Sequence, residues 1–338
     1  MLIFRENLVK FKICVIISLE EIFMAATYTH HLFTKDVYQA LDAEMKLKID
    51  LNIFNLFGKS FDALFFYKPK LGSYMHKNNA NLYFANIITY LRTYHETKNR
   101  ELLSYLYGSI CHYVLDSTVH PFIYYYGGKY DKKNKKTHKY RGRHDYLEGM
   151  IDAILYQERF NKPIYKAHVG KEVFPKIKFT INLKQIIDDV YKDTFEVSHG
   201  SKIYFKGYKR FRFAYKHLMN SRFGIKKKGY FLFDFLHILP SLKLQHFCYY
   251  VPKLDYSVLN LEHKKWCYPV DKKISFHYSF YDLYDVAIVK AVRFITMIND
   301  ALDKDDKAIK KVLKEIGNLG YGTGVNENRK VTMKYFAN

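Results

Sequence analysis

The stretch 111–121 reads CHYVLDSTVHP. On an α-helix, residues four and eight positions apart lie on one face, so His112, Asp116 and His120 project in the same direction. Imidazole and carboxylate groups arranged in this way bind metals in many helical proteins. The stretch therefore predicts a helix that carries one side of a metal centre.

A second stretch, 144–148, reads HDYLE and repeats the four-residue spacing. Two helical faces with metal-binding side chains predict an all-α fold, a multi-helix bundle with a multi-metal hydrolytic centre between its helices. Each pair taken alone could be an ordinary contact on a helix surface. The combination favours a metal centre, because burying so many polar groups is costly unless a metal binds them.

Apolar periodicity predicts helices over most of the chain. Because a proline restricts the residue before it, the helix with the first motif should end near His120, ahead of Pro121. The segment 124–140 contains a Gly-Gly pair and many lysines and should be a loop. The predicted helices cover residues 34–51, 81–97, 101–120, 143–159, 183–195, 202–219, 230–239, 278–302 and 306–317.

Composition indicates an ordered globular protein, since 49% of the 338 residues are hydrophobic and 26% are charged. No apolar run approaches the roughly 20 residues needed to cross a bilayer. The run 13–19 follows two lysines and superficially resembles a signal peptide. However, Glu20 and Glu21 interrupt it, and no small-residue cleavage site follows. We therefore do not expect export.

The four cysteines are scattered and form no CxxC pair. This predicts a reducing compartment without disulfides or a thiolate zinc site. We expect a cytoplasmic protein whose contact with membranes, if it has one, is peripheral. Met24 offers a second start, which would make residues 1–23 an extension ahead of one all-α domain at 24–338.

Lysines and arginines exceed acidic residues by 22. Coding bias is the simpler explanation, because lysines are spread over the chain and Asn, Ile, Tyr and Phe are abundant as well. Attraction to nucleic acid or anionic lipid is the functional alternative. The densest cluster, 129–143, lies between the two metal motifs. It is either a solvated loop or the mouth of a cleft that binds a phosphate or a lipid headgroup.

Further donors occur upstream of the two motifs. His30 and His31 lie in YTHHLF, Asp62 in FGKSFDALFF and His76 in GSYMHKNN. A single histidine among apolar residues is usually a core residue, and Asp62 could cap a turn. Together with the downstream motifs, these residues could complete a centre that holds more than one metal.

The order of these pieces resembles the zinc-dependent phospholipase C family, which is related to the trinuclear-zinc single-strand nucleases. The resemblance covers about residues 27–160. It rests on TH at 29–30, FD at 61–62, His76, HYxxD at 112–116 and HxxxE at 144–148.

The resemblance implies two or three zinc ions as cofactors. One zinc would be held by Asp62, His76, His112 and Asp116, a second by His120, His144 and Glu148, and a third by His30 with Asp116 bridging. His30 is preferred to His31 because it follows a threonine, as in relatives of this family. Asp62 would also be the catalytic general base.

Two features depart from the family pattern. Secreted bacterial members also hold the third metal with a processed N-terminal tryptophan, whereas the only tryptophan here is Trp266. An Ala25 amine freed by processing would lie five residues before His30 and could take that place. In addition, His120 precedes Pro121, whereas the matching histidine of the secreted enzymes follows the proline. This order resembles distant phospholipase D-like members that act on glycosylphosphatidylinositol.

We therefore expect a zinc-dependent phosphodiesterase that hydrolyses phospholipids in the manner of a phospholipase C. A single-strand nuclease on the same centre is the second hypothesis, because the positive charge and the many tyrosines would suit phosphates and bases. A third is an HD-type phosphohydrolase, in which Asp145 binds metal in place of Glu148. The fourth is a non-catalytic, lipid-binding helical protein whose histidines belong to its core.

Overall fold

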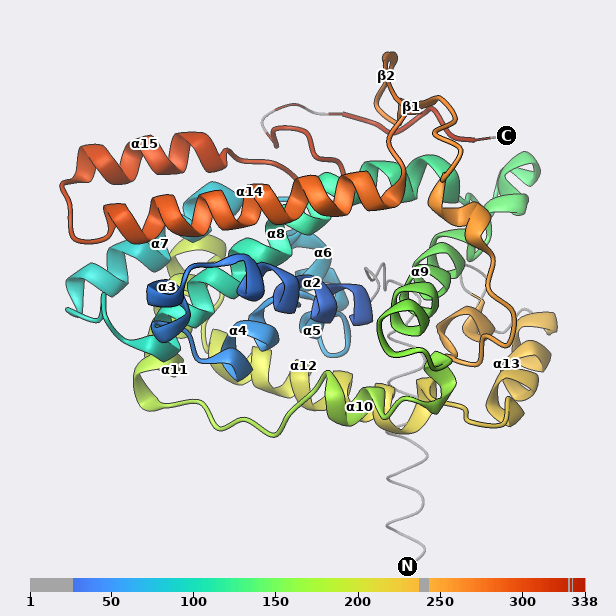
Figure 1. Cartoon of the computed structure of the whole chain (residues 1–338), viewed down its shortest axis with the longest axis horizontal. Helices are drawn as coiled ribbons and strands as arrows, with labels where there is room; N and C mark the ends of the chain where they lie inside the picture. Colours follow the sequence, from blue (N-terminus) through green and yellow to red (C-terminus); the bar gives the residue numbers. More distant parts are fainter. Residues whose placement is uncertain (1–26, 237–242, 328, 330, 338) are drawn as a thin grey trace, which may run out of the picture.

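The computed structural model describes residues 27–236, 243–327, 329 and 331–337. These residues form an α-helical molecule with one small sheet of two antiparallel strands, as the all-α prediction requires (Figure 1). The helices are α2 (Thr27–Ala40), α3 (Ala43–Leu47), α4 (Leu51–Phe57), α5 (Asp62–Phe65), α6 (Pro69–Met75), α7 (Ala80–Thr93), α8 (Arg100–Gly127), α9 (Arg143–Phe160), α10 (Val169–Glu172), α11 (Ile181–Phe195), α12 (Gly200–Ala214), α13 (Ile225–Phe235), α14 (Phe280–Ala301) and α15 (Asp306–Ile316). The strands are β1 (Trp266–Tyr268) and β2 (Asp271–Phe276), and the short helical turns are η2 (Lys135–Tyr140), η3 (Ile164–Lys166), η4 (Tyr215–Met219), η5 (Leu244–Phe247) and η6 (Tyr256–Leu259).

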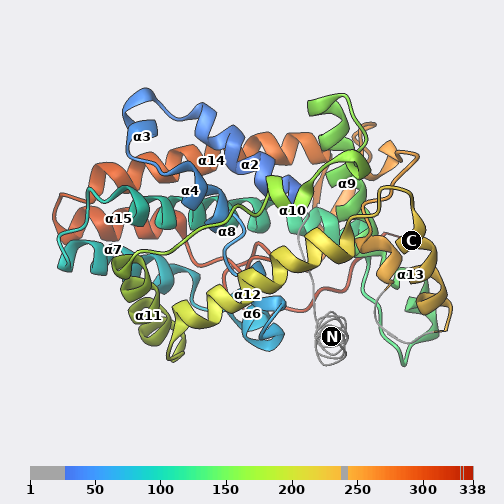
Figure 2. The same cartoon turned by 90° about the horizontal axis from the view of Figure 1, so that it is seen from below.

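Helix α8 lies at the centre of the fold. It is apolar and buried on nearly every side, which is typical of a helix enclosed by others. The side chain of Asn99 caps its first turn by accepting hydrogen bonds from the backbone N–H groups of Glu101 and Leu102. Helices α4 and α14 pack along α8, and α2 and α9 contact it as well (Figures 1 and 2). The helix that carries the first motif is therefore enclosed by the rest of the fold.

Helix α8 continues through Pro121 to Gly127, so the predicted end at His120 is wrong. A proline inside a helix leaves one backbone carbonyl without its helical partner, here that of Ser117. Gly324 of the C-terminal segment packs over this carbonyl and over the proline ring. A Cβ on Gly324 would lie 2.5 Å from the Ser117 oxygen. Tertiary packing at this point outweighs the local preference of the proline.

Other boundaries also differ from the prediction. The helix expected at 34–51 is divided, because the carboxylate of Asp42 accepts the N–H of Met45 and starts α3 as a new helix. The helix expected at 202–219 is α12 followed by a π-helical turn, η4. The expected loop at 124–140 contains the end of α8 and the turn η2. The two strands were not predicted, since a three-residue strand shows no readable alternation.

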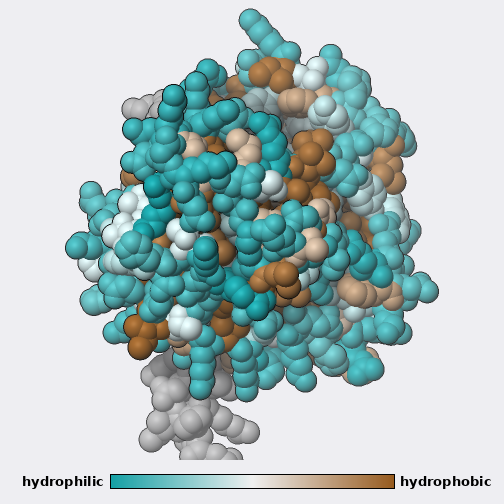
Figure 3. Space-filling model, turned by 60° about the vertical axis from the view of Figure 1, so that its left-hand side comes forward, coloured by the Kyte–Doolittle hydropathy of each residue, from teal (hydrophilic) through white to brown (hydrophobic). Residues whose placement is uncertain are grey.

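Some predictions fall outside the described residues. The extension at 1–23 and the Ala25 amine belong to this group, as do the last positions of the helix expected at 230–239. The single domain at 24–338 stays a prediction. Among the described residues, no helix has the length and apolar character needed to cross a bilayer. The face shown in Figure 3 is mostly hydrophilic, with scattered apolar patches.

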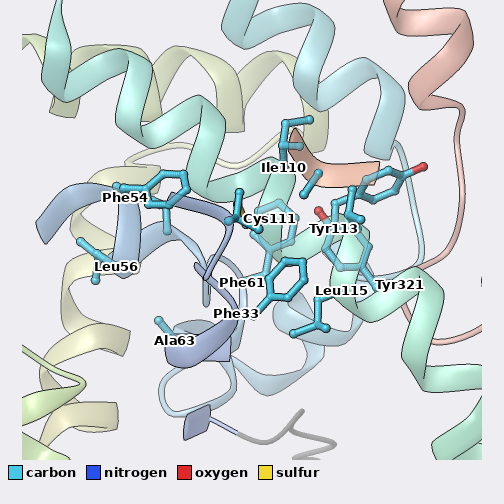
Figure 4. Packing of buried hydrophobic residues seen from close by; sticks show 14 of the residues in the cluster. Phe33, Phe54, Leu56, Phe61, Ala63, Ile110, Cys111, Tyr113, Leu115 and Tyr321 are labelled. Atoms are coloured by element: carbon cyan, nitrogen blue, oxygen red, sulfur yellow. The ribbon is translucent and has the colours of Figure 1, made fainter. Parts of the chain in front are cut away.

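Aromatic side chains from distant segments meet next to α8 (Figure 4). Phe61, which precedes α5, lies 4.9 Å from Tyr83 and 5.9 Å from Tyr321, measured between ring centroids. All three rings are fully buried, and Cys111 and Tyr113 of α8 are buried beside them. The metal motifs are therefore set in a dense apolar environment, which strengthens any electrostatic interaction between them.

Close helix packing gives a first test of the fold. A Cβ added to Gly108 on α8 would lie 2.5 Å from the carbonyl oxygen of Phe54 on α4, whereas a Cβ on Gly229 of α13 meets nothing within 4 Å. We expect Gly108→Ala to lower the free energy of unfolding by about 1–3 kcal/mol. The control, Gly229→Ala, should raise it by about 0.5–1 kcal/mol, because alanine favours a helix. Equal effects in denaturant titrations would contradict this packing.

Candidate metal centre

Five helices bring all eight predicted donors to one region of the molecule. None of these side chains exposes more than 11% of its surface. They form three groups, within each of which the donor atoms lie within 4.8 Å of one another. The donors are His30 on α2, Asp62 at the start of α5, His76 just after α6, His112, Asp116 and His120 on α8, and His144 and Glu148 on α9.

The first group consists of Asp62, His76 and His112. Oδ1 of Asp62 lies 3.2 Å from Nε2 of His76 and 3.4 Å from Nε2 of His112. Nδ1 of His76 lies 2.7 Å from the carbonyl oxygen of Gly72, which makes Nδ1 the donor and leaves Nε2 facing Asp62. A metal-binding histidine is commonly oriented in this way by a backbone carbonyl.

The second group consists of His30, His112 and Asp116. The carboxylate of Asp116 lies between the two rings, with Oδ1 3.1 Å from Nε2 of His30 and Oδ2 3.0 Å from Nε2 of His112. His112 therefore belongs to both groups, and metals held by them would be neighbours. His31 faces elsewhere, with its ring edge against Tyr28, 5.7 Å away. The geometry thus favours His30 over His31.

The third group consists of His120, His144 and Glu148. Oε1 of Glu148 lies 3.0 Å from Nε2 of His144 and 3.4 Å from Nε2 of His120. Asp145, the residue required by the HD hypothesis, is in none of the three groups formed by the described residues. His120 comes to this group from α8, one residue before Pro121.

Tyr321 is a contributor that the sequence did not reveal. Its carbonyl oxygen lies 3.2 Å from Nδ1 of His120, and its backbone N–H donates to the carbonyl oxygen of His76. Its ring packs edge-on against His112, 5.1 Å between centroids. The C-terminal segment therefore orients two histidines and covers a third, a role that outer partners of metal ligands commonly have.

Asp152 is a second contributor that the sequence analysis missed. Its carboxylate accepts hydrogen bonds from the N–H groups of Tyr28 and Thr29 and from the hydroxyl of Tyr249. A buried anion at the N-terminus of α2 suits the helix dipole and holds the turn that carries His30. The signal was present in the sequence, because Asp152 continues the four-residue spacing of His144 and Glu148.

The fit to a metal rests on polar atoms that the described residues leave unsatisfied. Both ring nitrogens of His30 and His112 are buried without a hydrogen bond, as is one carboxylate oxygen each of Asp62 and Asp116. Each such group costs about 1–3 kcal/mol if nothing binds it. Imidazole and carboxylate donors without thiolate suit zinc. The donor set therefore fits the cofactor expected from the sequence.

Mutual electrostatics shift the pKa values of these groups. Burial alone would lower the pKa of His112, but the carboxylates of Asp116 and Asp62 outweigh it and raise this pKa to about 10. Burial opposes ionisation of Asp62, yet the neighbouring histidines hold its pKa below the usual range. Burial raises the pKa of Glu148 to about 8. A metal must displace the protons of His112 and Glu148, so metal binding should weaken as the pH falls.

A cleft of about 1020 Å³ opens beside the donor groups. His76 of the first group and His120 and His144 of the third line it, so a ligand can reach these two groups directly. One wall comes from the lysine-rich segment between α8 and α9, and another from described residues of the C-terminal segment, among them Gly320, Glu327 and Met333. The cluster 129–143 therefore lies partly at the cleft rather than only in solvent.

Comparison with known proteins identifies one family. The model of the zinc-dependent phospholipase C family matches residues 29–208, which is more than half of the chain and contains all eight donors. No curated protein and no solved structure matches the chain.

Adjacent histidines allow a matched test of the centre. We expect His30→Gln to reduce the zinc retained per chain, because His30 belongs to a donor group. His31→Gln should keep the zinc content of the wild type, since His31 is in none of the donor groups of the described residues and its ring contacts Tyr28. Elemental analysis after dialysis measures both. Loss of zinc in the His31 variant alone would contradict the assignment.

Proposed function

The chain belongs to the zinc-dependent phospholipase C family, and from this premise we propose that it hydrolyses the phosphodiester bond of phospholipids. The products would be diacylglycerol and a phosphorylated headgroup. We assign two or three zinc ions to the eight donors described above. The observation that carries the proposal is the presence of three donor groups beside one large cleft.

Zinc bound by these residues would supply a water of lowered pKa and positive charge beside the phosphate. We assign to Asp62 the acceptance of the proton from that water. Its Oδ2 is buried, with no hydrogen-bond partner among the described residues. The neighbouring histidines hold the pKa of Asp62 below its usual range, so the carboxylate is charged at neutral pH.

Backbone carbonyl groups orient two of the histidines. The carbonyls of Gly72 and Tyr321 hold the Nδ1 atoms of His76 and His120, so the Nε2 atoms face the carboxylates. Such preorganisation favours catalysis, because the ligands need no rearrangement when the charge on the phosphate increases.

We propose that the cleft selects lipids with an anionic headgroup. Four cationic side chains line it, namely those of Lys77, Lys129, Lys132 and Arg329. Three acidic residues also line the cleft, namely Asp131, Asp145 and Glu327. The carboxylate of Glu327 accepts N–H groups at the start of α7, that of Asp131 accepts the N–H of Lys133, and burial raises the pKa of Asp145 to about 7. Positive charge of this density attracts phosphate and other anionic groups.

The proposed activity has a direct test. Zinc-loaded protein should release diacylglycerol from mixed phospholipid vesicles, and a chelator should abolish this release. His112→Ala should lower the rate by about 100-fold or more, since His112 belongs to two donor groups. A protein that leaves lipids intact while it cuts single-stranded DNA would establish the nuclease instead. Inactivity on both, with no bound zinc, would favour the non-catalytic hypothesis.

Headgroup selection is tested within the lysine-rich segment. The double variant Lys129→Ala and Lys132→Ala should raise KM for an anionic phospholipid by about 25-fold, with little change in kcat, because each lysine near a charged surface adds roughly fivefold. The control variant, Lys133→Ala and Lys136→Ala, removes the same charge from exposed residues of the segment that do not line the cleft. Equal changes in the two variants would argue for a general charge effect.

A further inference from the structure

Helix α13 presents apolar side chains to solvent. Asp234 is its only buried residue. Between 43% and 73% of each large apolar side chain on the outer surface of the helix is exposed, and flanking Phe223 and Leu236 are exposed by 75% and 59%. The exposed side chains within the helix are those of Ile225, Phe231, Leu232, Phe233 and Phe235.

The face of α13 that packs on the protein is held by polar contacts. Nζ of Lys227 donates to the carbonyl oxygen of Tyr250, and the hydroxyl of Tyr230 donates to that of Leu218. Lys227, Tyr230 and Asp234 recur at spacings of three and four, so they share one side of the helix. The usual amphipathic arrangement is therefore reversed.

Asp234 secures this orientation. Its carboxylate accepts hydrogen bonds of 2.7 Å and 3.0 Å from the backbone N–H groups of Leu244 and Gln245. Rotating α13 to bury its apolar side would break these bonds and leave the backbone N–H groups of Leu244 and Gln245 without their acceptor, which is unfavourable. The apolar surface is therefore a fixed feature of the fold, and apolar patches of this kind mark binding sites.

Positive charge adjoins the apolar surface. Arg222, Lys226 and Lys228 are exposed at the start of the helix. Nζ of Lys226 donates to the carbonyl oxygens of His217 and Asn220, so we assign the contact with anions to Arg222 and Lys228. A short helix with aromatic and aliphatic residues on one side and lysines beside them matches the composition of segments that lie in a membrane interface. Lysine stems follow the apolar surface while their charges meet anionic headgroups.

We infer that α13 is a docking surface for an anionic lipid bilayer. The apolar side chains of α13 would enter the headgroup region, and Arg222 and Lys228 would pair with lipid phosphates. A protein partner is the less favoured occupant, because cationic side chains beside apolar ones on one short exposed helix match an anionic lipid surface. Residues 225–235 lie beyond the region matched by the family.

The position of α13 relates it to the cleft. The guanidinium of Arg141 lies 3.4 Å from the carbonyl oxygen of Asp234, and the ring of His246 bonds the carbonyl oxygen of Gly142. Tyr140 and Gly142 line the cleft on the other side of the same segment. Figures 1 and 2 place α13 at the edge of the molecule, and it packs on η5, which also contacts α9. Docking would therefore hold the cleft near the bilayer, a consequence that rests on the proposed function, whereas binding itself does not.

Sedimentation with vesicles tests the docking surface. Zinc-loaded full-length protein should bind vesicles that contain phosphatidylserine and phosphatidylcholine more tightly than vesicles of phosphatidylcholine alone. The double variant Leu232→Ser and Phe235→Ser should weaken binding about tenfold or more, because two large apolar side chains lose their transfer into the interface. The matched control, Ile181→Ser and Val289→Ser, alters side chains that are 81% and 70% exposed on α11 and α14 and should leave binding unchanged.

Charge is tested separately. Lys228→Glu should weaken binding to the anionic vesicles about tenfold, whereas Lys310→Glu on α15 should have little effect. Circular dichroism verifies that each variant is folded. Equal binding by wild type and the α13 double variant would overturn the inference, and so would a concentration-dependent dimer that this variant abolishes.

The failure of this inference can be distinguished from failure of the proposed function. Hydrolysis of a short-chain phospholipid dissolved as monomers reports on the metal centre alone, and the α13 variants should retain it. Loss of vesicle hydrolysis with retained monomer hydrolysis supports docking by α13. Vesicle binding without any hydrolysis would refute the enzyme and leave the docking surface intact.

Discussion

A single buried carboxylate, that of Asp116, is the constraint on which the centre depends. Three histidines approach it, with nitrogen–oxygen distances of 3.1 Å to His30, 3.0 Å to His112 and 3.6 Å to His120. A charge removed from water must be balanced by partners of good geometry, or the fold loses several kcal/mol. The position of α2 relative to α8 is therefore constrained, because each helix must place an imidazole beside the carboxylate oxygens of Asp116.

The donors of α8 lie on a helix that stays continuous. His112, Asp116 and His120 follow one another at four-residue spacing, and α8 continues past them through Pro121. Gly324 covers the irregular turn at the proline, and the carbonyl oxygen of Tyr321 lies beside Nδ1 of His120. Residues outside the family match thus contact a candidate centre whose donors all lie inside it. The segment that carries Tyr321 and Gly324 is part of this candidate site.

The charges of the centre and the surface serve one purpose under the proposed function. A phospholipid has an anionic end and an apolar end, and it resides in an aggregate that water-soluble enzymes must reach. The cleft offers cations to the first, and α13 offers an apolar surface to the second. The lysine-rich cluster 129–143 contributes to the cleft, and its Arg141 donates a hydrogen bond to the carbonyl oxygen of Asp234 on α13. Part of the net charge of +22 is therefore gathered where an anionic interface would meet the protein.

The repeating spacing of His112, Asp116, His144 and Glu148 was readable from the sequence, as were the helical class and the family resemblance, because helical periodicity is a local property. The preference for His30 over His31 rested on the resemblance, and the directions of the two side chains agree with it. The role of Tyr321 came from the tertiary structure alone, since its backbone carbonyl lies beside a histidine ring 201 residues away. Every residue has such a carbonyl, so this contact leaves no pattern in the sequence. Asp152 did leave a pattern, its four-residue spacing from Glu148, but its partner 124 residues away became visible only in the structure. The passage of α8 through Pro121 and the outward apolar face of α13 were decided by packing rather than by local preference.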